Sequence, residues 1–326
     1  MSAIERHWDR LTPVSLALLP LSLVFCALVL ARRLLYRVGV LRSLRIPRPV
    51  IVVGNITVGG TGKTPLIIWL AEFLRQAGYA PGIVTRGYRG KSPSWPLVVK
   101  AATPAGMAGD EAVLLARRGH CPVVAGPDRV ESARQLMRLG CDVILSDDGL
   151  QHYRLARDLE IAVIDGTRRF GNGLCLPAGP LREPVTRLKA VDLCVANGVA
   201  LPGEVAMRLE PDGFYSLQSA GTRVALQHFA GQPVHAVAGI GNPQRFFAML
   251  QTLGLAVIPH PFPDHHVFQP GDLEFDDDRP VLLTEKDAVK CETFAKPNHW
   301  VLAVSARPGI EVGEQILQCL KEKIRG

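Results

Sequence analysis

The residues from 53 to 65, VGNITVGGTGKTP, have the types and nearly the spacing of a loop that binds nucleotide phosphates. Such loops follow the pattern G-x-x-x-x-G-K-[ST]: backbone amides surround the phosphates, the lysine reaches the β- and γ-phosphates, and the hydroxyl binds Mg²⁺. Gly62, Lys63 and Thr64 fit, whereas Thr57 stands where the first glycine is expected. We therefore predict a variant nucleotide loop; the alternative is a glycine-rich turn without a ligand. The predicted loop comprises Thr57, Val58, Gly59, Gly60, Thr61, Gly62, Lys63 and Thr64.

Two adjacent acids, Asp147 and Asp148, follow an apolar run in the segment VILSDDG. A phosphate-binding loop needs carboxylates at the end of a neighbouring strand to hold its metal ion. Acids after strands are also frequent turn formers, so this pattern gains its meaning from the loop. Together the two motifs predict an ATP site with Mg²⁺ held by Thr64, Asp147 and Asp148.

A kinase also needs a group that activates the acceptor hydroxyl, and two segments offer one. The segment AGDEAVLL carries Asp110 and Glu111, and FPDHHVF carries Asp264, His265 and His266. A carboxylate paired with a histidine can remove the proton of an alcohol. The Asp-His-His run has two other interpretations, a transition-metal site and ordinary loop residues.

One arginine is a candidate for neutralising charge on the transferred phosphoryl group. It is Arg182, in the glycine- and proline-rich segment GPLREP. An arginine in such a loop is usually a solvated side chain, so this signal needs support from the other motifs.

Two other classes of phosphate-loop protein fit less well. Ras-type GTPases need the guanine motif [NT]-K-x-D, and the nearest string, TEKD at 284–287, has the wrong spacing. They also need D-x-x-G, and the Asp148-Gly149 pair is too short for it. Membrane ATPases with a deviant loop carry a signature lysine where this chain has Val58. A kinase therefore remains.

The elements that must position these residues alternate between strands and helices. Apolar segments predict strands at 49–53, 82–88, 122–126, 141–149, 159–165 and 192–197, and helices at 63–77, 110–119 and 128–140. Near residue 220 the pattern restarts, with strands at 233–240, 255–260, 279–284 and 299–305 and helices at 243–254 and 314–324. Such alternation predicts an α/β fold with a largely parallel sheet. We expect a kinase core domain at 49–220 resembling P-loop NTPases, and a smaller α/β domain at 221–326.

The composition describes a folded chain with a positive charge. It has 326 residues, 48% hydrophobic and 21% charged, and a net charge of +7. The charge predicts an anionic partner, which could be a nucleic acid, a nucleotide or an acidic membrane surface. Seven cysteines occur without any C-x-x-C pair, which predicts reduced thiols in a cytosolic compartment rather than a zinc site.

Residues 1–48 are predicted to form a membrane-associated N-terminal helix with a basic collar. Residues 13–31 carry no charge, and six arginines follow, at 32, 33, 37, 42, 45 and 48. The apolar run is about the length of a bilayer span of ~20 residues. A full span, insertion into one leaflet and a helix of the soluble core are all compatible with it. Pro20, Ser15 and Ser22 interrupt the run, so we favour insertion from one face.

The combination of motifs resembles one family, the tetraacyldisaccharide 4′-kinases of lipid A biosynthesis. The strings that carry the resemblance are VGNITVGGTGKTP, TRGYRG, GDE, SDDGLQH, GNGLCLPAGPLREP, FPDHHVF and TEKDAVKC. It extends from the apolar N-terminus to about residue 291. It implies a bacterial enzyme on the cytoplasmic face of the inner membrane. This enzyme would move the ATP γ-phosphate to the 4′-hydroxyl of a tetraacylated glucosamine disaccharide 1-phosphate, giving lipid IVA.

The resemblance also implies roles for single residues. Lys63 and Thr64 would bind nucleotide, and Asp147 and Asp148 would be the metal-binding acids. Asp110 would be the catalytic base, with His265 rather than His266 as its partner across the domain cleft. Glu111 would serve the metal, and Arg182 would stabilise the phosphate. For Lys286, Asp287 and Lys290 the sequence gives no role, and it does not show how far the domains close.

The partners implied are the acylated disaccharide 1-phosphate and an anionic membrane surface, with no nucleic acid and no protein partner. Two alternative functions stay open at this point. One is a membrane-associated P-loop ATPase that acts as a switch and transfers no phosphate. The other is a soluble small-molecule kinase whose N-terminal segment is a core helix.

Overall fold

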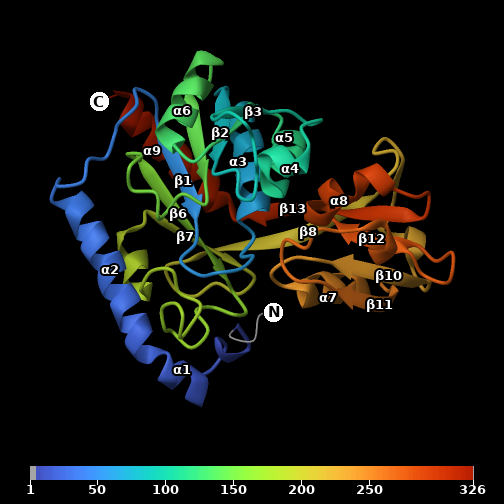
Figure 1. Cartoon of the computed structure of the whole chain (residues 1–326). Helices are drawn as coiled ribbons and strands as arrows, with labels where there is room; N and C mark the ends of the chain where they lie inside the picture. Colours follow the sequence, from blue (N-terminus) through green and yellow to red (C-terminus); the bar gives the residue numbers. More distant parts are fainter. Residues whose placement is uncertain (1–4, 326) are drawn as a thin grey trace.

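The computed structural model describes residues 5–325 and has two lobes joined by two long strands (Figure 1). The strands are β1 (Val50–Gly54), β2 (Pro81–Thr85), β3 (Leu97–Val99), β4 (Val123–Ala125), β5 (Val143–Asp147), β6 (Leu159–Asp165), β7 (Leu193–Asn197), β8 (Val205–Ser216), β9 (Arg223–Val224), β10 (Pro233–Ala238), β11 (Ala256–Pro261), β12 (Val281–Thr284) and β13 (His299–Pro308). The α-helices are α1 (Pro13–Ala17), α2 (Leu19–Arg37), α3 (Lys63–Gln76), α4 (Ala105–Ala108), α5 (Asp110–Arg118), α6 (Arg129–Arg138), α7 (Pro243–Thr252), α8 (Glu285–Cys291) and α9 (Ile310–Arg325).

One sheet runs through both lobes in the described part of the chain. Its strand order is β11-β10-β12-β13-β8-β7-β6-β1-β5-β2-β4-β3, with β9 paired to β8. Most neighbours are parallel; β3 with β4, β8 with β13 and β8 with β9 are antiparallel. The predicted α/β class with a largely parallel sheet is therefore confirmed. We call β1–β7 with α3–α6 and α9 the larger lobe, and β10–β12 with α7 and α8 the smaller lobe.

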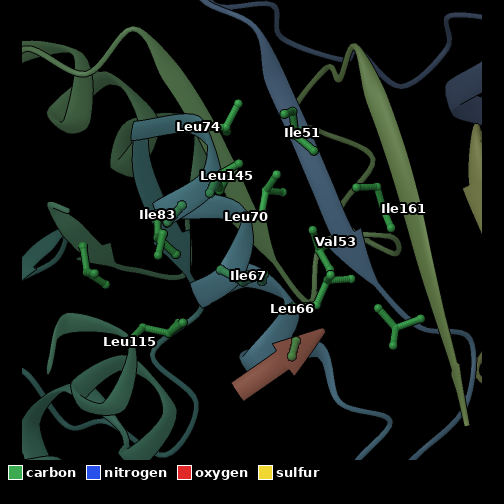
Figure 2. Packing of buried hydrophobic residues seen from close by; sticks show 14 of the residues in the cluster. Ile51, Val53, Leu66, Ile67, Leu70, Leu74, Ile83, Leu115, Leu145 and Ile161 are labelled. Carbon is green, nitrogen blue, oxygen red and sulfur yellow. The ribbon is translucent and has the colours of Figure 1, made fainter. Parts of the chain in front are cut away.

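The core of the larger lobe forms on both faces of this sheet. Alternate residues of β1 point to opposite faces, as the two-residue period of a strand requires. Ile51 packs under α3, while Val52 packs with α6 on the other face. Helix α3 places apolar residues three and four apart on its buried side, and Figure 2 shows Leu66 and Leu70 against the strands. This packing fixes the start of α3, where the nucleotide loop ends.

The joining strand β8 does not follow from the sequence pattern. It contains Pro211-Asp212-Gly213, a triplet typical of a turn. In the structure the pairing with β13 continues through this triplet, with a register shift between Ala303 and Val304 that accommodates the irregularity. The result is a long antiparallel pair whose two ends belong to different lobes.

The last helix returns to the larger lobe. Val312, Ile316 and Leu320 of α9 belong to the same buried cluster as Leu66 and Leu70 of α3. The end of the predicted domain 221–326 thus packs on the predicted core domain. The division near residue 220 stays a prediction, and so does the independence of the two parts.

The N-terminal helices lie along the outer edge of the larger lobe (Figure 1). Helix α2 has a mean hydropathy of 1.7 and is only 6% buried, so it is not a core helix. Its few polar contacts face the protein: the Ser22 hydroxyl donates to the Cys175 carbonyl at 2.7 Å. The Tyr36 ring lies 5.7 Å from that of Tyr153. Ser15 and Ser22 are both buried and therefore mark the side that rests on the protein, whereas Pro20 is exposed.

Candidate active site

The nucleotide loop connects β1 to α3 and is held by contacts from the rest of the larger lobe. The Val58 amide donates to the Pro180 carbonyl at 2.8 Å. The Asn197 side chain donates to the Thr61 carbonyl at 3.0 Å. Gly62 has a φ of 98°, and a Cβ there would lie 2.6 Å from the Asn197 amide nitrogen, so this position needs glycine. The loop is thus fixed at the N-terminus of α3, where anions bind well.

Lys63, Asp148 and Arg182 meet beside the loop. The Lys63 ammonium lies 3.5 Å from Asp148 Oδ1, and Arg182 donates to Asp148 Oδ2 at 2.7 Å. Burial alone would raise the pKa of Asp148, but the two cations outweigh it and hold that pKa well below its usual range. The three residues form a charged cluster beside the loop.

Asp147 is almost fully buried and accepts a hydrogen bond from the Thr85 hydroxyl at 3.1 Å. Burial, together with the nearby Glu111 and Asp148 carboxylates, raises the pKa of Asp147 to about 7. Asp148 Oδ1 is buried and accepts no hydrogen bond. Crowded carboxylates with an unsatisfied oxygen are the hard oxygen ligands that Mg²⁺ prefers. The donor set therefore fits the predicted metal, although no group of three or more His, Cys, Asp or Glu among the described residues forms a ready-made metal site.

Asp110 and His265 come from different lobes and meet across the cleft. Asp110 opens α5, and His265 Nδ1 lies 3.1 Å from Asp110 Oδ2. His265 has a φ of 58°, and its amide donates to the Gly239 carbonyl at 3.2 Å. Burial raises the pKa of Asp110, but the hydrogen bond from His265 and the charge of Lys286 bring it below its usual range. Asp110 is therefore an ionised carboxylate close to the cavity.

His266 faces another way. Its Nε2 lies 2.9 Å from Asp272 Oδ2, and its ring packs between Phe262 and Phe268. The two neighbouring histidines thus have separate carboxylate partners. This arrangement gives no support to a transition-metal site built from the Asp-His-His run, and it makes His265 the histidine of the cleft.

The TEKD segment supplies contacts whose purpose the sequence does not reveal. Lys286 donates to Glu111 Oε1 at 2.9 Å and lies 3.4 Å from His265 Nε2. Glu111 and Asp264 raise the pKa of Lys286 above its usual range despite burial. Asp287 is fully buried and accepts from the Gly239 amide at 2.9 Å and from Lys290 at 2.7 Å. This segment therefore binds both to its own lobe and to α5.

A cavity of about 450 Å³ lies between the lobes and joins the parts of the site. Its larger-lobe wall contains the loop from Val58 to Thr64, with Glu111 and Arg182. Its smaller-lobe wall contains Asp264, His265 and Lys286 among others. Asp110, Asp147 and Asp148 do not line the cavity. Asp110 contacts His265, which does, and Asp148 contacts Lys63 and Arg182, which also do. Asp147 directly precedes Asp148 in the chain.

Sequence reasoning missed two polar residues of this cleft. Asn197 ends β7 at the same edge of the sheet as the loop, and it accepts a hydrogen bond from Arg245 of α7 at 2.6 Å. The position of Asn197 at the carboxyl end of a parallel strand is a signal that could have found it. Arg245, which comes from the other lobe, has no such signal.

Comparison with known proteins identifies the family of this chain. A family model described as LpxK, tetraacyldisaccharide-1-P 4′-kinase, matches residues 14–323. The chain belongs to this family. Among LpxK relatives, a tetraacyldisaccharide 4′-kinase of Nitrosococcus oceani is 50% identical over 98% of this chain and 95% of that protein. One of Alkalilimnicola ehrlichii is 51% identical over 94% of each.

A solved LpxK structure is similar in fold. It is described as an "apo" form of LpxK from Aquifex aeolicus in complex with ATP, and it has a TM-score of 0.78. The two chains are 29% identical, and the match covers 94% of this chain and 99% of that one. The loop, the acids and the two-lobed cleft thus belong to an LpxK fold that spans nearly the whole chain.

Proposed function

We propose that this chain transfers the γ-phosphate of ATP to the 4′-hydroxyl of a tetraacyldisaccharide 1-phosphate, forming lipid IVA. Membership of the LpxK family supports the reaction, and its relatives carry the name of that kinase. The observation that carries the assignment of residues is His265, which lines the same cavity as the nucleotide loop and lies 3.1 Å from the Asp110 carboxylate behind it. Donor and acceptor groups would thus meet in one cavity.

The donor side would be handled by the larger lobe. The loop amides and the start of α3 would bind the phosphates, and Lys63 would reach the β- and γ-phosphates. In the structure Lys63 and Arg182 both pair with Asp148. Because these cations already lie together, they would neutralise charge on the phosphoryl group as it moves.

The acceptor side would be handled by Asp110 and His265. As the 4′-oxygen bonds to the γ-phosphorus, the bond between that phosphorus and the leaving oxygen breaks, and ADP departs. The hydroxyl proton passes to the ionised Asp110 carboxylate. His265, hydrogen-bonded to Asp110, would hold the carboxylate in place. A cleft closed by two lobes also excludes water, which limits the loss of ATP by hydrolysis.

Thr64, Asp147, Asp148 and Glu111 would hold Mg²⁺, which supplies positive charge to the phosphate oxygens. The crowding of Asp147 and Asp148 supports this assignment, since a divalent cation would relieve it. In the structure the Glu111 carboxylate pairs with Lys286, so Glu111 would have to break this ion pair to bind Mg²⁺.

The membrane contact would be made by one face of α1 and α2, on the cytoplasmic face of the bacterial inner membrane. The exposed apolar side chains here include Leu16, Leu21, Leu23, Val24, Leu28, Leu30, Leu34 and Leu35. Arg32 and Arg37 follow at the end of α2, where they would meet anionic headgroups. Because the opposite side of α2 rests on the protein through Ser22 and Tyr36, we favour insertion into one leaflet over a full span.

The decisive experiment incubates the protein with γ-labelled ATP, Mg²⁺ and the tetraacylated disaccharide 1-phosphate in mixed micelles, and then extracts the lipid. We expect label in the lipid fraction and ADP in equal amount. Label that appears only as inorganic phosphate would support the ATPase switch instead. The soluble-kinase alternative is tested by deleting residues 1–31: a soluble, fully active and detergent-independent product would favour it.

A further inference from the structure

The TEKD residues 284–287, here called the TEKD turn, end β12 and open α8, and they divide their contacts between the two lobes. Thr284 and Asp287 bind within the smaller lobe: Thr284 donates to Asp287 at 2.7 Å, and Asp287 accepts from the Gly239 amide. Glu285 and Lys286 reach α5 of the larger lobe. Glu285 pairs with Arg118 at one end of that helix, and Lys286 pairs with Glu111 at the other. In the proposed function above, none of these contacts takes part in phosphate transfer, and Glu111 would have to leave Lys286 to bind Mg²⁺.

Lys286 is the member of the turn that touches the reactive pair. Its side chain is 18% exposed, and its ammonium lies 2.9 Å from Glu111 Oε1, 3.5 Å from Asp264 Oδ1 and 3.4 Å from His265 Nε2. An ammonium group has three donors and no acceptor, so every one of these partners must accept. His265 Nε2 therefore carries a lone pair and no proton when this contact is made.

In the neutral His265 ring, the single N–H proton must then be on Nδ1. A neutral imidazole has one N–H, and if Nε2 accepts, Nδ1 must carry it. Nδ1 is the atom that lies 3.1 Å from Asp110 Oδ2. His265 Nδ1 consequently donates to Asp110, and His265 Nε2 accepts from the Lys286 ammonium.

We propose that Lys286 is a positioning residue of the transfer reaction: it fixes the Nδ1–H tautomer of His265, so that Asp110 alone is free to accept the proton of the acceptor hydroxyl. This inference rests on the proposed role of Asp110. It also gives the TEKD turn a purpose, because Asp287 anchors Gly239, and the Gly239 carbonyl in turn accepts from the His265 amide. One turn thus sets both the backbone and the ring of His265.

The opposing explanation is that Lys286 only attracts one lobe to the other. A second ion pair provides the matched control, because Arg117 of α5 pairs with Glu292 just after α8. This pair joins α5 to the segment that directly follows α8, and within the described residues it makes no hydrogen bond or ion pair with Asp110 or His265. Loss of simple attraction between the lobes would affect both pairs alike.

The experiment compares Lys286→Met, Lys286→Arg and Arg117→Met, and repeats Lys286→Met in a His265→Ala background. We expect Lys286→Met to lower kcat by about 10- to 100-fold while KM for ATP stays within about threefold, since misplacement of a reacting group has costs of this size. Lys286→Arg, which keeps donors and charge, should recover most of the activity. Arg117→Met should stay within about threefold of the parent, and in the His265→Ala background Lys286→Met should add less than about threefold, because coupled residues are non-additive.

Three results would overturn the proposal. They are an unchanged kcat in Lys286→Met, a loss of kcat in Arg117→Met as large as that in Lys286→Met, and a loss of kcat on adding Lys286→Met to His265→Ala as large as that in the parent protein. Should Lys286→Met not fold, the ¹⁵N spectrum of histidine-labelled parent protein decides, with His265→Gln to assign the signal. A protonated Nδ1 supports the proposal, and a protonated Nε2 overturns it. Asp110→Asn is assayed alongside: full transfer by that variant refutes the proposed site, whereas inactivity there with full activity of Lys286→Met refutes only the role of Lys286.

Discussion

The two sides of the cleft are built in different ways. The donor side is built around one continuous piece of chain, a strand, a loop and a helix. Its other members, Asp148 and Arg182, and its anchors, such as Asn197 and Pro180, all come from the same lobe. The acceptor side is assembled from segments more than 150 residues apart, since Asp110 opens α5 and His265 lies in a turn of the smaller lobe. Its geometry therefore depends on how the two lobes meet.

This difference has a consequence for function. Nucleotide binding at the loop can persist when the lobes are disturbed, because the loop is held within the larger lobe. Proton removal cannot, because Asp110, His265 and Lys286 are aligned only while the lobes are in contact. Changes on the donor side should weaken both binding and transfer, whereas changes on the acceptor side should weaken transfer alone.

Lys63→Ala tests the donor side and should reduce both ATP binding and phosphate transfer. Removing the ammonium that would meet the transferred phosphate should lower transfer by about 10³-fold or more and weaken ATP binding as well. Calorimetric titration with ATP, together with the lipid-labelling assay, measures both. Retention of normal ATP affinity by this variant would break the proposed contrast between the two sides.

A pair of glycine variants tests whether the loop is held as rigidly as its contacts indicate. Gly62→Ala would place a Cβ 2.6 Å from the Asn197 side chain at a φ of 98°, so it should lower stability by about 1–3 kcal/mol. Gly60→Ala is the control, because a Cβ there would meet nothing within 4 Å and the backbone of Gly60 is not in the left-handed region. Denaturant unfolding without nucleotide compares them; equal stability of the two variants would show that Asn197 does not constrain the loop.

The smallest effect concerns pH and the metal. The pKa of Asp147 is raised to about 7, above its unfolded value, so the folded state favours the protonated form. The metal-free protein should therefore lose stability as pH rises from about 4 through about 7. Mg²⁺ requires the ionised form, and its stabilising effect should be greater at about pH 8 than at about pH 6. Thermal unfolding with and without Mg²⁺ measures this; a pH-independent effect, or the same pH dependence in Asp147→Asn, would contradict it.

The features that the sequence predicts are mostly those formed by one continuous segment, and the features that it misses are mostly those formed by distant segments. The loop, Asp147, Asp148 and the alternating elements have local signals in the sequence. The role of Asn197 and Arg245, the contacts of the TEKD turn and the long pair of β8 with β13 depend on segments distant in sequence. The resemblance implies His265 rather than His266, and the structure supplies a physical reason: His266 is paired with Asp272.

The most direct test of the two-sided site is Asp110→Asn, with ATP binding and lipid phosphorylation measured on the same preparation. The side chain keeps its size and loses its basicity. We expect transfer to fall by about 10²- to 10⁴-fold, the range for a lost general base, while the Kd for ATP stays within about threefold. Full transfer by the variant, or loss of ATP binding together with transfer, would contradict the account.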